Sequence, residues 1–226
     1  MLAVRRALAL GAHPDDVELQ AGGTLAAWAR TGVHVTVACF TAGEKGSADP
    51  AADPAALGAR RRGEAAAAAA VLGAVAPRFL GAVDGELEVT MPLRLAVAQL
   101  VREVRPDVVL GHDPWRRGLL HPDHRAAGLL TVDGVVAARD PLYAPAAGLP
   151  AHRPHTLLLF ATDAPDEVVD VAATIDAKLA ALRAHASQVG DPGDLERRVR
   201  IWNAAIGSDV GLAYAEAFHT LDTRGR

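Results

Sequence analysis

An alternation of short apolar runs with longer stretches of helical spacing constrains the fold of this 226-residue chain more than any other feature of its sequence. The apolar runs at residues 6–12, 33–40 and 107–111 have the length and composition of buried strands. Between the first two runs, apolar residues recur at helical spacing until Gly32. Strands that alternate with helices in this way predict an α/β fold: a Rossmann-like open, mainly parallel sheet with helices on both faces.

The same alternation continues to the end of the chain. Further strands are expected at residues 77–80 and 156–160. Residues 44–59 are rich in Gly, Ala, Asp and Pro, and we predict a long loop there. No repeat or linker interrupts the pattern, so residues 1–226 are expected to form one domain. Further helices are expected at residues 60–72, 93–104, 122–139, 172–185 and 195–206.

The composition is that of a packed globular protein, with 50% hydrophobic residues, 22% charged residues and a formal net charge of −4. This charge supplies no general attraction to nucleic acid or anionic lipid. No apolar stretch approaches the roughly 20 residues that span a bilayer, and the run after Arg6 is too short for a signal peptide. The single cysteine, Cys39, cannot form an intrachain disulfide. We therefore expect a cytoplasmic protein without nucleic-acid or membrane partners. These features do not decide whether the chain forms a homo-oligomer.

Two clusters of histidine and aspartate lie close to the ends of predicted strands. Residues 13–16 (His-Pro-Asp-Asp) come directly after the first strand, and residues 121–124 (His-Pro-Asp-His) come a few residues after the strand at 107–111. In open α/β sheets, ligands bind beyond the carboxyl ends of the strands. The two clusters, although far apart in the chain, are therefore expected to form one site.

The residue types in these clusters favour a catalytic zinc site. Zinc in such sites takes three protein ligands from His, Asp, Glu or Cys and leaves a position for water. His121 and His124 are three residues apart, so both lie on one face of a first helical turn. A metal lowers the pKa of water and polarises an amide carbonyl, while a nearby carboxylate accepts the proton. Asp15 and Asp16 suit such a division, with one as the metal ligand and the other as the base. The residues alone do not decide which aspartate has which role.

Each cluster also has an ordinary structural explanation. Residues 13–16 are compatible with a loop whose aspartate caps the next helix. Residues 121–124 are compatible with a helix that begins at a proline. Neither cluster is specific by itself, but their shared position after strands of one sheet favours the metal site.

Other sequence features are less informative. Residues 22–24 (Gly-Gly-Thr) suit either close approach of a ligand or close helix packing. Residues 42–47 contain glycine and lysine but do not follow the order of a phosphate-binding P-loop. The arginines at 60–62 are compatible with a solvated helix start, and Trp115 is a candidate for lining a pocket. Purely structural or surface roles are expected for Trp28, Trp202, His34, His112, His152, His155 and His219.

The two clusters belong to longer motifs. Residues 11–24 read GAHPDDVELQAGGT, and residues 105–109 (RPDVV) precede the HPDH of residues 121–124. These motifs resemble the two signatures of the LmbE-like or PIG-L N-acetylglucosaminyl deacetylases. The resemblance covers nearly the whole chain, with weaker similarities at residues 61–73, 178, 187–188 and 214–218.

The resemblance implies which residues bind the metal and which acts as the base. His13, Asp16 and His124 are implied to bind zinc, although a set of two histidines and one aspartate also accepts Fe²⁺ or another divalent metal. Asp15 is implied to be the general base that activates the attacking water.

The resemblance also implies roles around the second cluster. His121 would stabilise the oxyanion and protonate the leaving amine, with Asp123 orienting or tuning it. Arg61, among the three neighbouring arginines, resembles a substrate-contacting position. Leu119 lies two places before His121, the implied acid, at a position where some family members have a tyrosine or another polar residue. Residues 115–120 are also less acidic than the corresponding residues of many relatives.

The activity implied by the resemblance is hydrolysis of the N-acetyl group of an N-acetylglucosamine-type sugar or conjugate, with a small amino-sugar molecule as substrate. An alternative with the same metal chemistry is an amidase for a thiol-sugar conjugate or another secondary-metabolite amide. A third hypothesis, from another class, is a non-catalytic sugar-binding or nucleotide-binding module. The absence of G-x-G-x-x-G after the first strand already disfavours dinucleotide binding.

Overall fold

A computed structural model describes residues 4–143 and 148–223 of the chain. Its centre is a sheet with strand order β3-β2-β1-β4-β5-β7-β6. Neighbouring strands from β3 through β5 pair in parallel, whereas β7 runs antiparallel to both β5 and β6. The strands are β1 (Arg6–Gly11), β2 (His34–Thr41), β3 (Arg78–Ala82), β4 (Val108–His112), β5 (Thr156–Phe160), β6 (Glu167–Asp170) and β7 (Ala215–Asp222).

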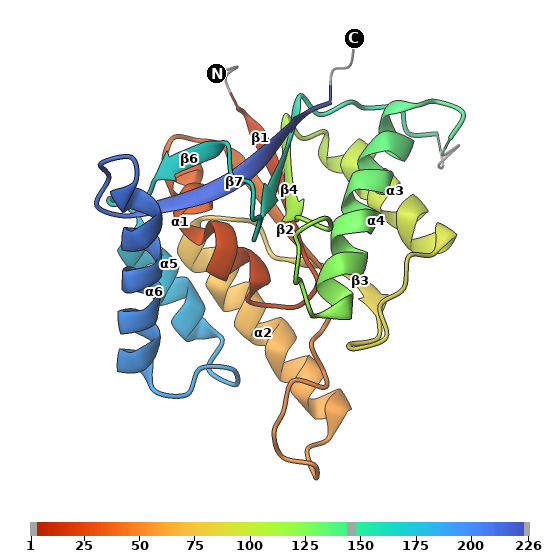
Figure 1. Cartoon of the computed structure of the whole chain (residues 1–226). Helices are drawn as coiled ribbons and strands as arrows, with labels where there is room; N and C mark the ends of the chain where they lie inside the picture. The colour runs from red at the N-terminus through yellow and green to blue at the C-terminus, as the bar shows by residue number, and fades with distance from the viewer. Residues whose placement is uncertain (1–3, 144–147, 224–226) are drawn as a thin grey trace.

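Helices cover both faces of this sheet (Figure 1). One face packs against α3 and α4 through a large apolar cluster that includes Leu10, Val101 and Leu130. The opposite face packs against α1, and α2 and α5 lie against that helix. The helices are α1 (Asp16–Arg30), α2 (Pro54–Leu72), α3 (Met91–Val104), α4 (Pro122–Arg139), α5 (Ile175–Ala184) and α6 (Pro192–Ser208).

The predicted α/β class is confirmed, with a mainly parallel sheet and helices on both faces. Two details of the prediction were wrong. Residues 44–59 are not all loop, because α2 begins at Pro54, where the Asp53 carboxylate accepts a hydrogen bond of 2.9 Å from the Ala55 amide. An aspartate before a proline is a favourable helix start, and it outweighs the turn-like composition of this segment. The antiparallel pair β6 and β7 was not predicted at all.

The direction of the chain through the sheet reverses beside β1. From β1 the chain moves outward to β2 and β3, and it then crosses over to β4 on the other side of β1. Adjacent strands whose connections leave in opposite directions open a crevice at their carboxyl ends. The two histidine-aspartate clusters follow these two strands, so the fold brings them to one crevice.

The Gly-Gly-Thr segment of α1 serves close packing. The buried Glu216 carboxylate of β7 accepts hydrogen bonds from the Gly23 amide (2.9 Å), the Thr24 amide (2.8 Å) and the Thr24 hydroxyl (2.6 Å). Lys178 of α5 lies 2.7 Å from the same carboxylate and is fully buried. A Cβ at Gly23 would come within 2.7 Å of Val171. Glycine therefore lets α1 approach the ion pair that joins α5 to β7.

No helix in the described part of the chain is long and apolar enough to cross a membrane.

Candidate active site

Strand β1 ends in a tight turn that carries the first cluster. A Cβ at Gly11 would lie 2.9 Å from the Asp16 Cβ, so glycine makes room for the turn. The His13 amide donates a hydrogen bond of 2.8 Å to Asp16 Oδ2. Asp15 has a φ of 99°, a conformation that costs free energy in a residue other than glycine and is often found at functional sites. The turn thus separates the two aspartates, with Asp16 buried and Asp15 partly exposed.

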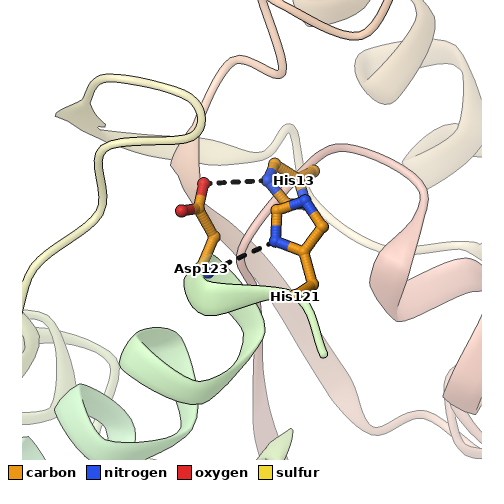
Figure 2. Close-up of side chains that lie close together, drawn as sticks. All are labelled: His13, His121 and Asp123. Carbon is orange, nitrogen blue, oxygen red and sulfur yellow. Dashed lines mark hydrogen bonds and ion pairs between the residues drawn. The ribbon is translucent and has the colours of Figure 1, made fainter. Parts of the chain in front are cut away.

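The structure brings together the three residues predicted to bind metal. One potential ligand atom from each of His13, Asp16 and His124 lies within 4.8 Å of the other two. His124 Nε2 is 3.2 Å from Asp16 Oδ1, and His13 Nδ1 is 3.6 Å from Asp16 Oδ2. His13 lies in the turn after β1, Asp16 is the first residue of α1, and His124 lies in the first turn of α4. A second group with the same spacing consists of His13, His121 and Asp123 (Figure 2).

The electrostatics of this group suit a cation. Burial disfavours the protonated form of His13, but the carboxylates of Asp16 and Asp84 outweigh it and raise the pKa of His13 to about 10. Burial also disfavours ionisation of Asp16, but His112, His124 and His13 hold its pKa well below the ordinary value. Two imidazoles and a carboxylate are the donor types of catalytic zinc sites. The residues present therefore fit a divalent metal both in donor type and in charge.

Asp123 is linked to both clusters. Its buried carboxylate lies 3.1 Å from His13 Nε2 and accepts hydrogen bonds from the amides of Gly85 (2.7 Å) and Leu87 (3.3 Å). Its own amide donates to His121 Nδ1 at 3.2 Å, as Figure 2 shows. The carboxylate therefore fixes His13, whereas His121 is held by the Asp123 backbone.

His121 lies at the exposed edge of the site. Its ring stacks on His124 with centroids 4.6 Å apart and meets His13 edge-on at 4.8 Å. Partial burial, together with these two neighbouring histidines, lowers the pKa of His121. The side chain can thus reach a substrate that enters from solvent, while its ring is oriented by the first turn of α4.

Arg61 lies directly behind Asp15. The buried guanidinium is 3.2 Å from Asp15 Oδ2 and donates to the carbonyl oxygens of Gly43 (2.8 Å) and Pro14 (2.7 Å). Burial and the nearby Asp16 raise the pKa of Asp15 to about 7, although Arg61 opposes this shift. The Asp15 side chain is still 32% exposed, so it can contact a substrate or a water molecule.

The three neighbouring arginines have different environments. Arg60 pairs with Glu64 at 2.9 Å, and the Arg62 guanidinium lies 4.3 Å from the centre of the Phe79 ring. Only Arg61 of the three reaches the site, where a Cβ at Gly43 would clash with its guanidinium. The guanidinium contacts described above all join Arg61 to other protein atoms. A contact between Arg61 and substrate therefore stays a prediction.

Two residues that contact the predicted metal ligands were not predicted from the sequence. His112, expected to be a surface or satisfied histidine, is 1% exposed; its Nε2 lies 3.1 Å from Asp16 Oδ2 and its ring stacks on His124 at 4.3 Å. Asp84 lies 3.0 Å from His13 Nε2 and accepts a hydrogen bond from the Lys45 amide. Both lie at or just beyond the carboxyl ends of parallel strands, which is the signal that could have identified them.

The sequence of this chain matches one family model, and three known deacetylases resemble the chain. The family model PIG-L, described as GlcNAc-PI de-N-acetylase, matches residues 8–135. Diacetylchitobiose deacetylase of Thermococcus kodakarensis is 33% identical over 220 residues, which cover 94% of this chain and 82% of the relative. The 1D-myo-inositol 2-acetamido-2-deoxy-alpha-D-glucopyranoside deacetylase of Mycobacteroides abscessus is 32% identical over 270 residues, with 99% of this chain and 94% of the relative covered.

The third resemblance is structural. The structure of N,N'-diacetylchitobiose deacetylase from Pyrococcus horikoshii, complexed with its inhibitor MPG, superposes with a TM-score of 0.92 at 30% sequence identity. The match covers 97% of this chain and 85% of that chain. The similarity therefore extends over nearly all of the fold, including both strands that lead into the site.

Proposed function

Because the chain belongs to the PIG-L family of de-N-acetylases, we propose that it is a zinc-dependent hydrolase that removes the N-acetyl group of an N-acetylglucosamine-type sugar or conjugate. One observation carries the proposal. His13, Asp16 and His124 lie together beside the partly exposed carboxylate of Asp15, so a metal and a base would face the same small volume.

The predicted family and the predicted enzyme class, an amide hydrolase acting on N-acetyl groups, are confirmed by the sequence and structural relatives. The names of two relatives specify an acetylated disaccharide and an inositol glycoside of an acetamido sugar. Both substrates carry an N-acetylated amino sugar. We therefore assign such a sugar, rather than a peptide or a free amino acid, to the reacting part of this enzyme's substrate.

The metal would be held by His13, Asp16 and His124. When bound, zinc polarises an amide carbonyl and lowers the pKa of a water molecule. Fe²⁺ is a second candidate, because this donor set does not discriminate strictly between divalent metals. Asp123 and Asp84 support the site by fixing His13 through its Nε2.

Asp15 supplies the base. Its carboxylate accepts a proton from the water whose oxygen forms a bond to the carbonyl carbon. A base is most effective when its pKa lies near the working pH, and burial beside Asp16 raises the pKa of Asp15 to about 7. Arg61 keeps the carboxylate in place through its hydrogen bond to Oδ2.

His121 completes the reaction at the exposed edge of the site. Since its Nδ1 accepts the Asp123 amide hydrogen bond, His121 donates from Nε2–H to the developing oxyanion. As the carbon–nitrogen bond breaks, the amine nitrogen receives a proton through His121, and the proton that Asp15 accepted from the water replaces it. Acetate and the free amino sugar are the products. Asp123 contributes to this step as a positioning residue, since its amide donates to His121 Nδ1.

Replacement of Asp15 tests this assignment. Asp15→Asn keeps the shape of the side chain but removes the base, so we expect amine release to fall about 10²- to 10⁴-fold while the metal content stays that of the wild type. His124→Ala should lose both metal and activity. Asp209→Asn, which changes an exposed aspartate at the end of α6, is the matched control. Wild-type turnover in Asp15→Asn would refute the base assignment.

A further inference from the structure

A polar hollow of about 570 Å³ lies at the end of the sheet opposite the candidate active site. The active site follows the carboxyl ends of β1 and β4, whereas this hollow lies where β1, β2 and β4 begin. In Figure 1 this end of β1 is the one nearest the N-terminus. We name it the arginine hollow. The residues that line it are Arg5, Arg6, His34, Arg105, Asp107 and His152.

The three arginines of the hollow have unpaired side chains. The guanidinium groups of Arg5, Arg6 and Arg105 form no hydrogen bond or ion pair with residues 4–143 or 148–223. Most other arginines in these two segments contact a carboxylate, a carbonyl oxygen or an aromatic ring, as Arg94 does with Asp133. Unpaired guanidinium groups thus gather around one hollow instead of being spread over the surface.

The one carboxylate of the arginine hollow is already bonded by the backbone. Asp107 Oδ2 accepts hydrogen bonds from the amides of Arg5 (2.7 Å) and Arg6 (3.0 Å), which tie the start of β1 to the start of β4. With both histidines neutral, three guanidinium groups and one carboxylate leave an excess of two positive charges, in a chain whose net charge is −4. A phosphate monoester carries about −1.5 to −2 charges at neutral pH, so its charge matches that of the hollow.

Arg105 adopts a backbone conformation that favours glycine. It follows the last turn of α3 with a φ of 52°, where glycine is the usual residue because a Cβ costs free energy in the left-handed region. Such conformations gather at functional sites. Attraction to the C-terminal end of α3 accounts for a cation at this position, but not for two more cations, Arg5 and Arg6, at the start of β1.

A second, more apolar hollow of about 430 Å³ shares Asp107 with the arginine hollow. Its size falls within the range of about 300–1,000 Å³ of small-molecule sites. The organic part of a phosphate ester therefore has an apolar surface to contact beside the arginines. The apolar residues that line this second hollow are Val4, Trp28, Val108, Leu158 and Val169.

We propose that the arginine hollow binds a phosphate dianion, either inorganic phosphate or the phosphate group of a small organic ester. The planar fork of a guanidinium group matches the spacing of phosphate oxygens, and three such forks line one concave surface. A membrane or a nucleic acid fits less well, because the net charge of the whole chain repels an extended polyanion. This site is separate from the one that hydrolyses the amide, and it does not depend on the proposed function.

Calorimetric titration of the metal-loaded protein with inorganic phosphate, at constant ionic strength and slightly above neutral pH, tests the proposal. Arg6→Gln removes one guanidinium group, and we expect it to weaken phosphate binding about tenfold, as the loss of one charge-assisted hydrogen bond would. Arg116→Gln is the matched control, because Arg116 also lacks a partner among the described residues but lines a different hollow. It should leave the affinity unchanged.

A second ligand distinguishes the two sources of phosphate. Phenyl phosphate is titrated under the same conditions. Tighter binding of phenyl phosphate than of inorganic phosphate, with both weakened in Arg6→Gln, would support an organic ester whose ring occupies the apolar hollow. Equal affinities that fall together in Arg6→Gln would support inorganic phosphate.

Arg105→Gly separates binding from folding. Glycine adopts a φ of 52° without strain, so thermal unfolding should occur at the wild-type temperature or above it, while phosphate binding weakens about tenfold. A lower unfolding temperature with unchanged phosphate affinity would assign the guanidinium to the fold and overturn the proposal.

Two further results would overturn it. Phosphate also binds metal ions, so an affinity that is unchanged in Arg6→Gln and Arg105→Gly but lost in His124→Ala would place the phosphate on the active-site metal. The absence of binding of both ligands, by calorimetry and by phosphorus NMR, would show that the arginines form only a solvated surface.

Discussion

The carboxylate of Asp16 is contacted on both oxygens by neighbouring groups. Oδ2 accepts a hydrogen bond of 2.8 Å from the His13 amide and lies 3.1 Å from His112 Nε2, while Oδ1 lies 3.2 Å from His124 Nε2. Burial, opposed only in part by Asp16, lowers the pKa of His112, which favours the neutral ring, and a proton on Nε2 makes the contact with Asp16 a hydrogen bond. His112 therefore orients a predicted metal ligand without touching the substrate.

Replacing His112 with phenylalanine removes the donor but keeps a ring that can stack on His124. Loss of a residue that orients a metal ligand typically weakens metal binding about 10- to 100-fold, and we expect a loss of that size. Competition with a chromogenic chelator measures it directly. His152→Gln changes a histidine that contacts the Pro106 carbonyl oxygen instead, and it should leave the affinity unchanged. An unaltered zinc affinity in His112→Phe would show that Asp16 needs no such support.

Two roles are compatible with the position of Arg61: it positions the Asp15 carboxylate, or it binds substrate. Lysine cannot reproduce the fork that reaches Asp15, Gly43 and Pro14 at once. If Arg61 positions Asp15, Arg61→Lys should lower kcat about 10- to 100-fold through misplacement of the base, with little change in KM. A rise in KM at constant kcat would instead support the predicted contact with substrate. Arg62→Lys, on the same helix over Phe79, is the control for steady-state kinetics.

The site residues that occur in groups are predictable from the sequence, whereas those that occur singly are not. His13, Asp15 and Asp16 are adjacent in the chain, and so are His121, Asp123 and His124, so their donor types could be read together. His112 and Asp84 stand alone at strand ends, and only the sheet reveals that they face the first cluster.

At the level of elements, the buried ion pair of Lys178 and Glu216 connects α5 to β7, and Glu216 also binds the backbone of α1. All of these groups are satisfied by hydrogen bonds, which is the condition for a buried charge pair to be tolerated. The pair therefore fixes the arrangement of three elements on the α1 side of the sheet.

Removing one partner of this pair should destabilise the fold. Lys178→Met leaves the Glu216 carboxylate buried without its cation, which typically costs about 3–5 kcal/mol. Urea unfolding followed by circular dichroism measures the change in the free energy of unfolding. Lys45→Met, which breaks the exposed pair with Glu86, is the matched control and should have little effect. Equal stability of the two variants would contradict this role.

The elements that sequence reasoning predicted best are those with a clear period and clear ends. The helix at residues 122–139 begins at a proline and was predicted with the bounds of α4. Strand β6 has only four residues, and β7 is half-buried and carries the charged Glu216 at its buried end. Neither has the continuous apolar run of a central strand, and their antiparallel pairing depends on contacts distant in sequence.

At the scale of the whole molecule, the position of the site follows from the reversal of chain direction beside β1. The crevice between β1 and β4 receives the first cluster from one strand and the second from the start of α4. Alternation in the sequence predicts the parallel sheet, but not which strands are neighbours. The order of the strands is what brings the two distant motifs together in one candidate metal site.

The central claim is that this crevice holds a metal that is required for amide hydrolysis. The most direct measurement is amine release from an N-acetylglucosamine conjugate by protein stripped of metal and then titrated with Zn²⁺. We predict no turnover after chelation and a linear recovery that ends at about one equivalent of metal per chain, as expected for a single catalytic site. Full turnover by protein that mass spectrometry shows to be free of metal would contradict the claim.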